Sequence, residues 1–152
     1  MKTLLTMLVL AVAVSGCNKQ AFPETARGGQ MSRAVLDPYL KIEDALSQDS
    51  TEGIRQNAGE IATAATALGA PAMKIDTAAV QLAAAGDLDD AREKFGTLSV
   101  AIDTYMKGFN LTAPEGVRVA YCPMAQKPWL QQGSMLANPY YGKAMPTCGE
   151  FR

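Results

Sequence analysis

The sequence predicts a mainly α-helical domain, an antiparallel bundle of about four helices with a C-terminal strand and loop region packed on one end. Three observations carry this prediction. Apolar residues recur at spacings of three and four along four successive segments before Pro114, which is the period of a helix face. Short connections with glycine or proline separate these segments, which favours antiparallel neighbours. After Pro114 the period changes.

The N-terminus predicts an exported protein. Lys2 supplies a positive charge, and residues 4–14 are apolar apart from Thr6. This run is too short to span a bilayer as a permanent helix. A charged start followed by a short apolar run is typical of a signal peptide, here over residues 1–16.

The residue that follows the predicted signal peptide indicates a lipid anchor. Val14 to Cys17 comprise an aliphatic residue, two small residues and a cysteine, which resembles the bacterial lipobox and implies lipidation of Cys17 as the first mature residue. An ordinary secretory signal with an incidental cysteine is the alternative. Asn18, rather than aspartate, favours the periplasmic face of the outer membrane. We expect residues 17–32 to be a polar tether and 33–152 a single domain.

Charge and residue inventory exclude several functions. The chain carries 14 basic and 15 acidic residues without a basic cluster, so nucleic acid is not an expected partner. It has no histidine, which removes the commonest general base and the commonest metal ligand. No glycine-rich phosphate loop follows a strand, and Glu115 and Glu150 are isolated carboxylates. We therefore expect no enzymatic activity.

The first helix is predicted from one apolar face, formed by Val35, Tyr39, Ile42 and Leu46. Pro38 is tolerated if it lies in the first turn, with Asp37 as a possible cap. A kink is expected there if the helix starts earlier.

Three further helices follow. The second helix has an apolar stripe that Gly69 and Pro71 end: Ile54, Ala58, Ile61, Ala65 and Leu68. The third has a short, alanine-rich stripe that Gly86 ends: Ala72, Ile75, Ala79 and Leu82. Asp87 is the predicted cap of the fourth helix, which Gly108 and Pro114 close. Its apolar face is the most regular: Leu88, Ala91, Phe95, Leu98, Ile102, Tyr105 and Phe109.

The C-terminal segment differs from the helices in both period and composition. Residues 117–121 alternate, which predicts a short strand. Beyond Cys122 no period holds, and four prolines predict an ordered loop rather than a helix or strand: Pro123, Pro128, Pro139 and Pro146. Cys122 and Cys148 bracket this segment, each with a methionine close by.

The motifs of this segment resemble a known family. They are Cys-Pro-Met-Ala from Cys122, a Trp-Leu pair at Trp129, Asn-Pro-Tyr-Tyr-Gly-Lys-x-Met from Asn138, and Thr-Cys-Gly-Glu from Thr147. Together with residues 44–49 and 87–99, they resemble a bacterial periplasmic domain of unknown function. That domain occurs alone or appended to the periplasmic adaptor proteins of Cus-type copper and silver efflux systems. The resemblance covers residues 34–151 and implies a copper or silver context with an efflux adaptor as a partner.

The sulfur atoms have two interpretations. Thiolates and thioethers are soft donors suited to Cu(I) or Ag(I), so Cys122, Met124, Met145 and Cys148 form a candidate metal site. Zinc is disfavoured because its structural sites take four Cys or His ligands. Alternatively, Cys122 and Cys148 form a disulfide, as exported cysteines often do, in a protein-interaction module that binds no metal. The two are compatible if Cu(I) binds only the reduced pair.

The aromatic residues also have two interpretations. Trp129, Tyr140 and Tyr141 form either a recognition surface or a small core that pins the loop to the bundle. Burial preferences favour the core.

Overall fold

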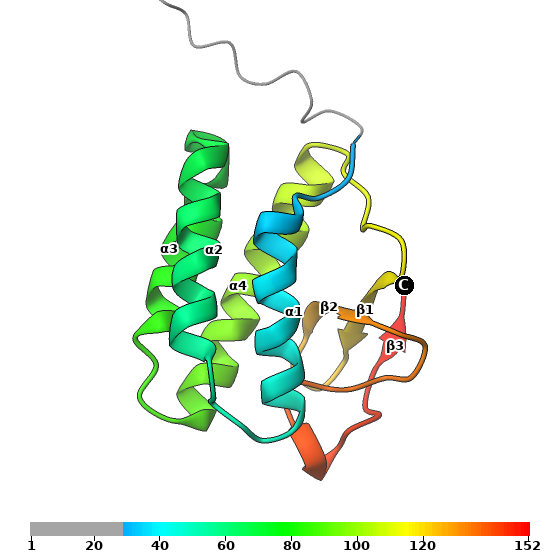
Figure 1. Cartoon of the computed structure of the whole chain (residues 1–152). Coiled ribbons are helices and arrows are strands. Elements are labelled where there is room, and N and C mark those ends of the chain that lie inside the picture. The colour runs from blue at the N-terminus through cyan, green and yellow to red at the C-terminus, as the bar shows by residue number, and fades with distance from the viewer. Residues whose placement is uncertain (1–28) are drawn as a thin grey trace, which may run out of the picture.

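The computed structural model describes residues 29–152, of which four α-helices and a small sheet are the main elements (Figure 1). The helices are α1 (Arg33–Ser47), α2 (Ile54–Leu68), α3 (Met73–Ala83) and α4 (Leu88–Gly108). The strands are β1 (Val117–Cys122), β2 (Lys127–Gln132) and β3 (Glu150–Phe151). Short 3₁₀ turns occur at η2 (Ala70–Ala72) and η3 (Gly142–Ala144). The predicted signal peptide and the predicted lipid anchor at Cys17 lie outside the described residues.

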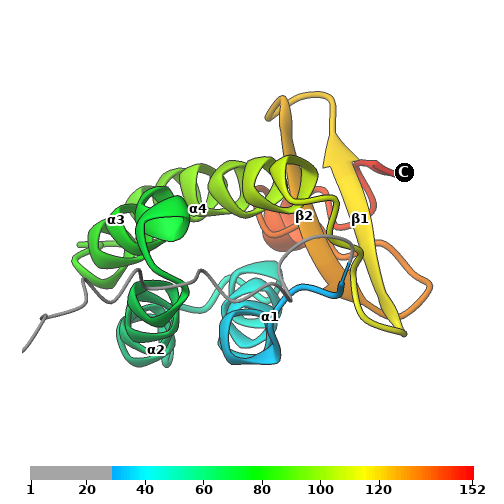
Figure 2. The same cartoon turned by 90° about the horizontal axis from the view of Figure 1, so that it is seen from above.

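The helices form an antiparallel bundle, as the sequence predicts. Consecutive helices run in opposite directions (Figure 1), and seen from above α1 and α2 form one layer and α3 and α4 the other (Figure 2). The sheet covers the side formed by α1 and α4 (Figure 2). The mainly α fold with a C-terminal strand region is confirmed. Among the described residues, no helix has the length and apolar character needed to cross a membrane.

Helix α1 starts before Pro38, so the prediction of a start at Pro38 with Asp37 as the cap is wrong. The helix begins at Arg33, so Pro38 lies inside it, and Ser32 rather than Asp37 occupies the N-cap position. Asp37 is instead paired with Arg33 at 3.4 Å. The helix extends upstream because Val35 and Leu36, both fully buried, complete its apolar face.

The predicted tether ends earlier than residue 32. Gln30 forms a parallel bridge with Thr112, and the Met31 N–H donates to the Thr112 carbonyl at 3.0 Å. The Met31 side chain is 1% exposed. Residues 30–32 therefore belong to the domain, tied to the segment that follows α4.

The boundaries of the other helices follow local signals. Asp87 caps α4 through a 2.9 Å hydrogen bond that its carboxylate accepts from the Asp90 N–H, which confirms the predicted cap. Gly69 ends α2 with a φ of 82°, a positive value that glycine adopts without strain because it has no Cβ.

Large side chains connect α1 to α4 in the core. Tyr39 stacks on Phe95 with ring centroids 4.9 Å apart. The Tyr39 hydroxyl shares a 2.7 Å hydrogen bond with Ser99, which satisfies both groups inside the core. The same hydroxyl accepts a 3.2 Å hydrogen bond from the Leu130 N–H of β2. Tyr39 thus joins both helix layers to the sheet.

The sheet has the order β2-β1-β3 and is antiparallel throughout. The expectation of a loop after Cys122 is wrong for Lys127–Gln132, which form β2 although they include Pro128. Proline is tolerated because β2 is an edge strand, where no neighbour needs its missing N–H. On that outer edge the Pro128 carbonyl accepts a hydrogen bond from the Tyr140 hydroxyl.

Candidate functional site

The sheet brings Cys122 and Cys148 together. Cys122 is the last residue of β1, and Cys148 comes two residues before β3. The pairing of Tyr121 with Glu150 aligns the two segments. The Sγ atoms lie 3.9 Å apart, well beyond the roughly 2.05 Å of a disulfide bond, so the structure shows the pair in its reduced form. Both predicted interpretations need this proximity, and neither is decided by it.

The Cys122 sulfur lies in a closed environment that offers hydrogen-bond donors. Its side chain is fully buried. The Ala125 N–H donates to it at 3.4 Å from the β1–β2 turn, and the Asn138 side-chain amide donates at 3.3 Å. Cys122 is therefore the inner, acceptor sulfur of the pair.

Cys148 is the outer sulfur of the pair. It is partly exposed, and its N–H donates to the Met145 carbonyl at 3.2 Å in a tight turn. Burial, then the neighbouring Cys122 thiol, raises the pKa of the Cys148 thiol. A metal ion that binds both sulfurs must therefore displace a proton from Cys148 at neutral pH.

The two predicted methionine ligands lie close to the pair along the chain, but they differ in exposure. Met124 lies in the turn between β1 and β2 and is 59% exposed. Met145 is partly buried and begins the turn that leads to Cys148. Within residues 29–152, no three His, Cys, Asp or Glu side chains group into a metal site. A metal ion at the sulfur pair thus needs a thioether or an external group as a third ligand.

The aromatic residues of the segment pack inward. Trp129 is 1% exposed and meets Tyr140 edge-on, with ring centroids 6.0 Å apart. Tyr140 continues to Phe95 of α4 at 6.1 Å, while Tyr141 is half-buried. Trp129 and Tyr140 therefore pin the C-terminal segment to the bundle, and their rings are not presented as a recognition surface.

A polar cluster fixes the loop between β2 and β3. Arg92 of α4 is paired with Asp49, at the end of α1, at 2.5 Å, and its Nε donates to the Pro139 carbonyl at 3.3 Å. Asp49 also accepts from the Lys143 N–H at 3.3 Å. Hydrogen bonding from Arg92, more than any other cause, lowers the pKa of Asp49. The cluster joins the ends of both helices to the loop near η3.

Gly142 is required where this loop passes the Arg92–Asp49 pair. Its φ is +52°, and a Cβ at this position would collide with Asp49 Oδ1 and Arg92 Nη2. We expect Gly142→Ala to destabilise the protein by about 2 to 3 kcal/mol, from backbone strain plus overpacking, measured by urea unfolding. Gly133→Ala is the matched control, because Gly133 has a φ of +92° but no heavy atom within 4 Å of the position that a Cβ would take. Equal losses in the two variants would show that the Asp49–Arg92 contact has no part in the effect.

The sequence does not single out Asn138, Arg92 or Asp49 as site residues. Asn138 precedes a proline, a pair that is typical of a turn, yet its side chain is fully buried against Cys122. In the sequence, an Asn-Pro pair looks the same whether its turn is exposed or buried. Only the contact with Cys122, 16 positions earlier, shows that this turn is buried.

Glu43 of α1 is a buried acid. Its side chain, on α1, is 6% exposed, and within residues 29–152 its Oε1 has no hydrogen-bond partner. Burial, then the nearby Asp44 charge, raises its pKa to about 8. The acid is therefore mainly protonated at pH 7.

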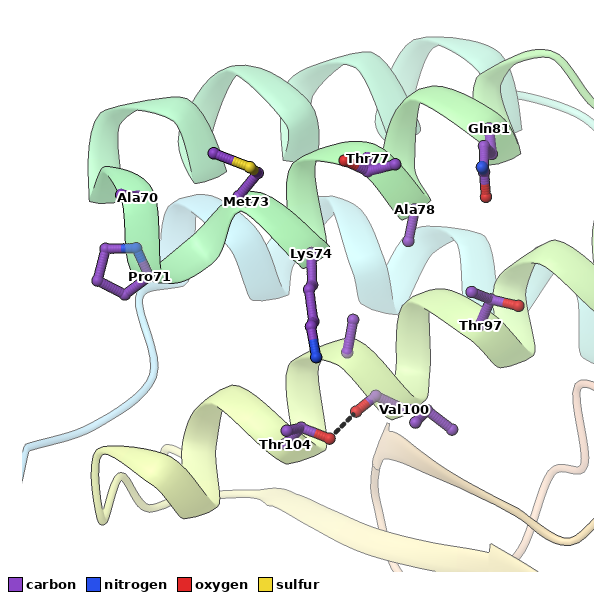
Figure 3. Close-up of a pocket in the computed structure, with 11 residues that line it drawn as sticks. Ala70, Pro71, Met73, Lys74, Thr77, Ala78, Gln81, Thr97, Val100 and Thr104 are labelled. Atoms are coloured by element: carbon purple, nitrogen blue, oxygen red, sulfur yellow. Dashed lines mark hydrogen bonds between the residues drawn. The ribbon is translucent and has the colours of Figure 1, made fainter.

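A groove lies between α3 and α4, away from the sulfur atoms. The groove has a volume of about 620 Å³, and Figure 3 shows Lys74 reaching from α3 toward α4 beside Val100 and Thr104. Met73 and Val100, which line it, are 63% and 42% exposed. Among the described residues that line it, only Lys74 is charged, so they include no acid–base pair for catalysis.

Comparison with known proteins identifies the helical part of the chain. A family model described as a protein of unknown function, DUF3347, matches residues 35–113. The matched segment covers nearly all of α1 through α4 and ends before β1, so the cysteines lie outside it. No curated protein and no solved structure matches the chain.

Proposed function

Since the chain belongs to the DUF3347 family, whose description assigns no activity, we propose a function from its own residues: the protein is an accessory to copper or silver handling. It binds Cu(I) or Ag(I) transiently at the Cys122–Cys148 pair. In this proposal the chain is anchored by lipid at Cys17 on the periplasmic side of the outer membrane. It passes the metal ion to, or docks on, a periplasmic efflux adaptor.

The separation of the two cysteine sulfurs is the observation that carries the proposal. At 3.9 Å, both sulfurs reach one metal ion if each bond has the length of a zinc–thiolate bond, about 2.3 Å, and the angle at the metal is then about 115°. That angle suits a three-coordinate site, with a methionine thioether as the third, weaker ligand. Met145 is favoured over Met124 because it is the less exposed of the two.

The chemistry of the pair supports a soft cation. Thiolate and thioether sulfur select Cu(I) over hard cations. The chain has no histidine to complete a zinc or Cu(II) site. Cys148 is partly exposed while Cys122 is buried, so an ion has a sulfur to meet at the surface and a second one behind it.

The first test is an anaerobic titration of the reduced protein with Cu(I) against a competing chelator. We expect one Cu(I) per chain and an affinity that rises with pH, because binding displaces the Cys148 proton. The double variant Cys122→Ser, Cys148→Ser should lose at least about 100-fold in affinity, and Met145→Leu about tenfold.

Met135→Leu is the control variant, because Met135 is 84% exposed in the segment after β2, and its affinity should equal that of the wild type. An unchanged affinity in the double serine variant would show that copper binds elsewhere or not at all.

The alternative function is a disulfide-stapled interaction module without metal. It is favoured by the same proximity, because the sulfurs need to approach by only about 2 Å to form a bond, and by the oxidising compartment that the predicted signal peptide implies. Thiol counting by alkylation and mass spectrometry separates the two functions. If the protein isolated from the periplasm has two alkylatable thiols, its function does not require the disulfide.

A further inference from the structure

Asn138 connects the two segments that carry the sulfurs. Its side chain is fully buried. One amide hydrogen is directed to the Cys122 sulfur at 3.3 Å, and the amide nitrogen also donates to the Cys148 carbonyl at 2.5 Å. A single side chain thus contacts both members of a pair that lie 26 positions apart in the chain.

The orientation of this amide is determined by its oxygen. Asn138 Oδ1 accepts from the Tyr140 N–H at 2.8 Å and from the Tyr141 N–H at 3.3 Å. Backbone N–H groups donate only, so the oxygen must face them and the nitrogen must face the cysteines. Every polar group of the side chain is then used, as a buried amide requires.

The backbone of Asn138 is held as well. Its N–H donates to the Pro146 carbonyl at 2.8 Å, and its carbonyl accepts from the Gly142 N–H at 2.9 Å. These bonds close the loop that carries Tyr140 and Tyr141 on the Phe95 side of the bundle. The side-chain amide therefore extends from a rigid base, and its two donors can fix the distance between the sulfur-bearing segments.

We propose that Asn138 is the positioning residue of the Cys122–Cys148 pair, holding the two thiols at a separation from which they act together on one soft ion or on one another. The inference deepens the copper and silver function and rests on it only for the identity of the ion. The positioning itself is a property of the thiols and has a readout without any metal.

Positioning acts through the effective concentration of one thiol for the other. Two thiols that are held face to face exchange with an external disulfide more favourably than two that must be brought together. Oxidised glutathione is a suitable probe. The pair loses two electrons and two protons and forms its own disulfide, while one oxidised glutathione becomes two reduced ones.

The experiment measures this exchange equilibrium for the folded protein and three variants. Asn138→Ala removes both donors and the acceptor. Asn138→Asp is close to isosteric and keeps an acceptor for Tyr140 and Tyr141, but it has no N–H. We expect both to lower the effective concentration at least about tenfold, which makes the reduction potential of the pair about 30 mV less negative.

Gln131→Glu is the matched control. Gln131 is also a buried amide at 1% exposure. Its Oε1 accepts from Trp129 Nε1 at 3.0 Å, and its Nε2 donates to the Met135 carbonyl. The acid keeps the acceptor and loses the donor, as in Asn138→Asp, but no cysteine is involved. We expect its exchange equilibrium to match that of the wild type even where its thermal stability falls.

The outcomes separate this inference from the proposed function. A tenfold loss in both Asn138 variants, with none in Gln131→Glu, supports the positioning role even if the wild type binds no Cu(I), in which case only the metal proposal fails. If both Asn138 variants have the same exchange equilibrium with glutathione as the wild type, the inference is overturned, whether or not Cu(I) binds. An equal loss in Gln131→Glu also overturns it, because the effect would then follow general destabilisation of the loop.

Discussion

Replacing Glu43 by glutamine is expected to stabilise the protein at neutral and basic pH by several kcal/mol. Burial, followed by the Asp44 charge, raises the pKa of Glu43 from 4.5 to about 8 in the folded protein. Between these two values the folded state holds a proton that the unfolded state releases. Stability therefore falls as pH rises through this window, by a total on the order of 3 to 5 kcal/mol.

Glutamine has the shape of the neutral acid and does not titrate. In Glu43→Gln the free energy of unfolding therefore no longer falls with pH on account of this residue. Tyr39 and Tyr140, whose pKa values are raised mainly by burial and in part by Glu43, stay neutral throughout and add no slope. Urea unfolding of reduced protein at pH 5, 6, 7 and 8 is the measurement. The two proteins should be similar at pH 5 and diverge steadily toward pH 8.

Glu60→Gln is the control for this experiment. Glu60 is an exposed acid on α2 that accepts a hydrogen bond from Gln56 at 3.1 Å, and Glu60→Gln should stay within about 0.5 kcal/mol of the wild type. Parallel slopes in the wild type and Glu43→Gln would mean that water or a rearranged side chain satisfies the Glu43 carboxylate.

Replacing Trp129 by alanine is expected to reduce the free energy of unfolding by about 3 to 5 kcal/mol. The indole is 1% exposed and packs against Tyr140. It also lies so close to Gly149 that a Cβ there would be 2.6 Å from Trp129 Cη2. Its loss leaves a cavity between β2, the C-terminal segment and the bundle.

Urea unfolding followed by far-UV circular dichroism is the appropriate measurement, because Trp129 is the only tryptophan and its fluorescence is lost with it. Trp129→Phe keeps an aromatic ring and should lose about half as much. Met135→Ala, at a site 84% exposed, should stay within about 0.5 kcal/mol of the wild type. A loss below about 1 kcal/mol in Trp129→Ala would show that the C-terminal segment contributes little to the stability of the bundle.

The two variants also report on different parts of the molecule. Glu43 acts from α1 by an electrostatic effect that depends on pH, whereas Trp129 acts from β2 by packing at every pH. Cys148 is the neighbour of Gly149, on which the indole packs. Trp129→Ala should therefore also separate the sulfur pair, and Glu43→Gln should leave it in place.

The helical part of the fold follows from local signals in the sequence. A stripe such as Ile54, Ala58, Ile61 and Ala65 has its period whatever surrounds it. The Asp87 cap and the Gly69 terminator act within one helical turn. The start of α1 is harder to predict, because Val35 and Leu36 favour a helix through Pro38 only once there is a core to bury them.

The C-terminal region depends instead on contacts between distant residues. From the sequence alone, Pro128 indicates the end of a regular strand. Only its place on the outer edge of the sheet makes it compatible with one. All four sulfur residues are recognisable by type, but the approach of Cys122 to Cys148 is not. The pairing of Tyr121 with Glu150 decides that the two cysteine sulfurs lie 3.9 Å apart.

By itself, the sequence determined the helices, the absence of histidine and the soft donors available for a site. Helix period and capping depend on neighbours a few residues away, and composition depends on no structure. The tertiary structure alone decided that Asn138 contacts both cysteine segments and that Arg92 and Asp49 hold its loop. These contacts join residues 10 to 94 positions apart, and their formation depends on the packing of the sheet against α1 and α4.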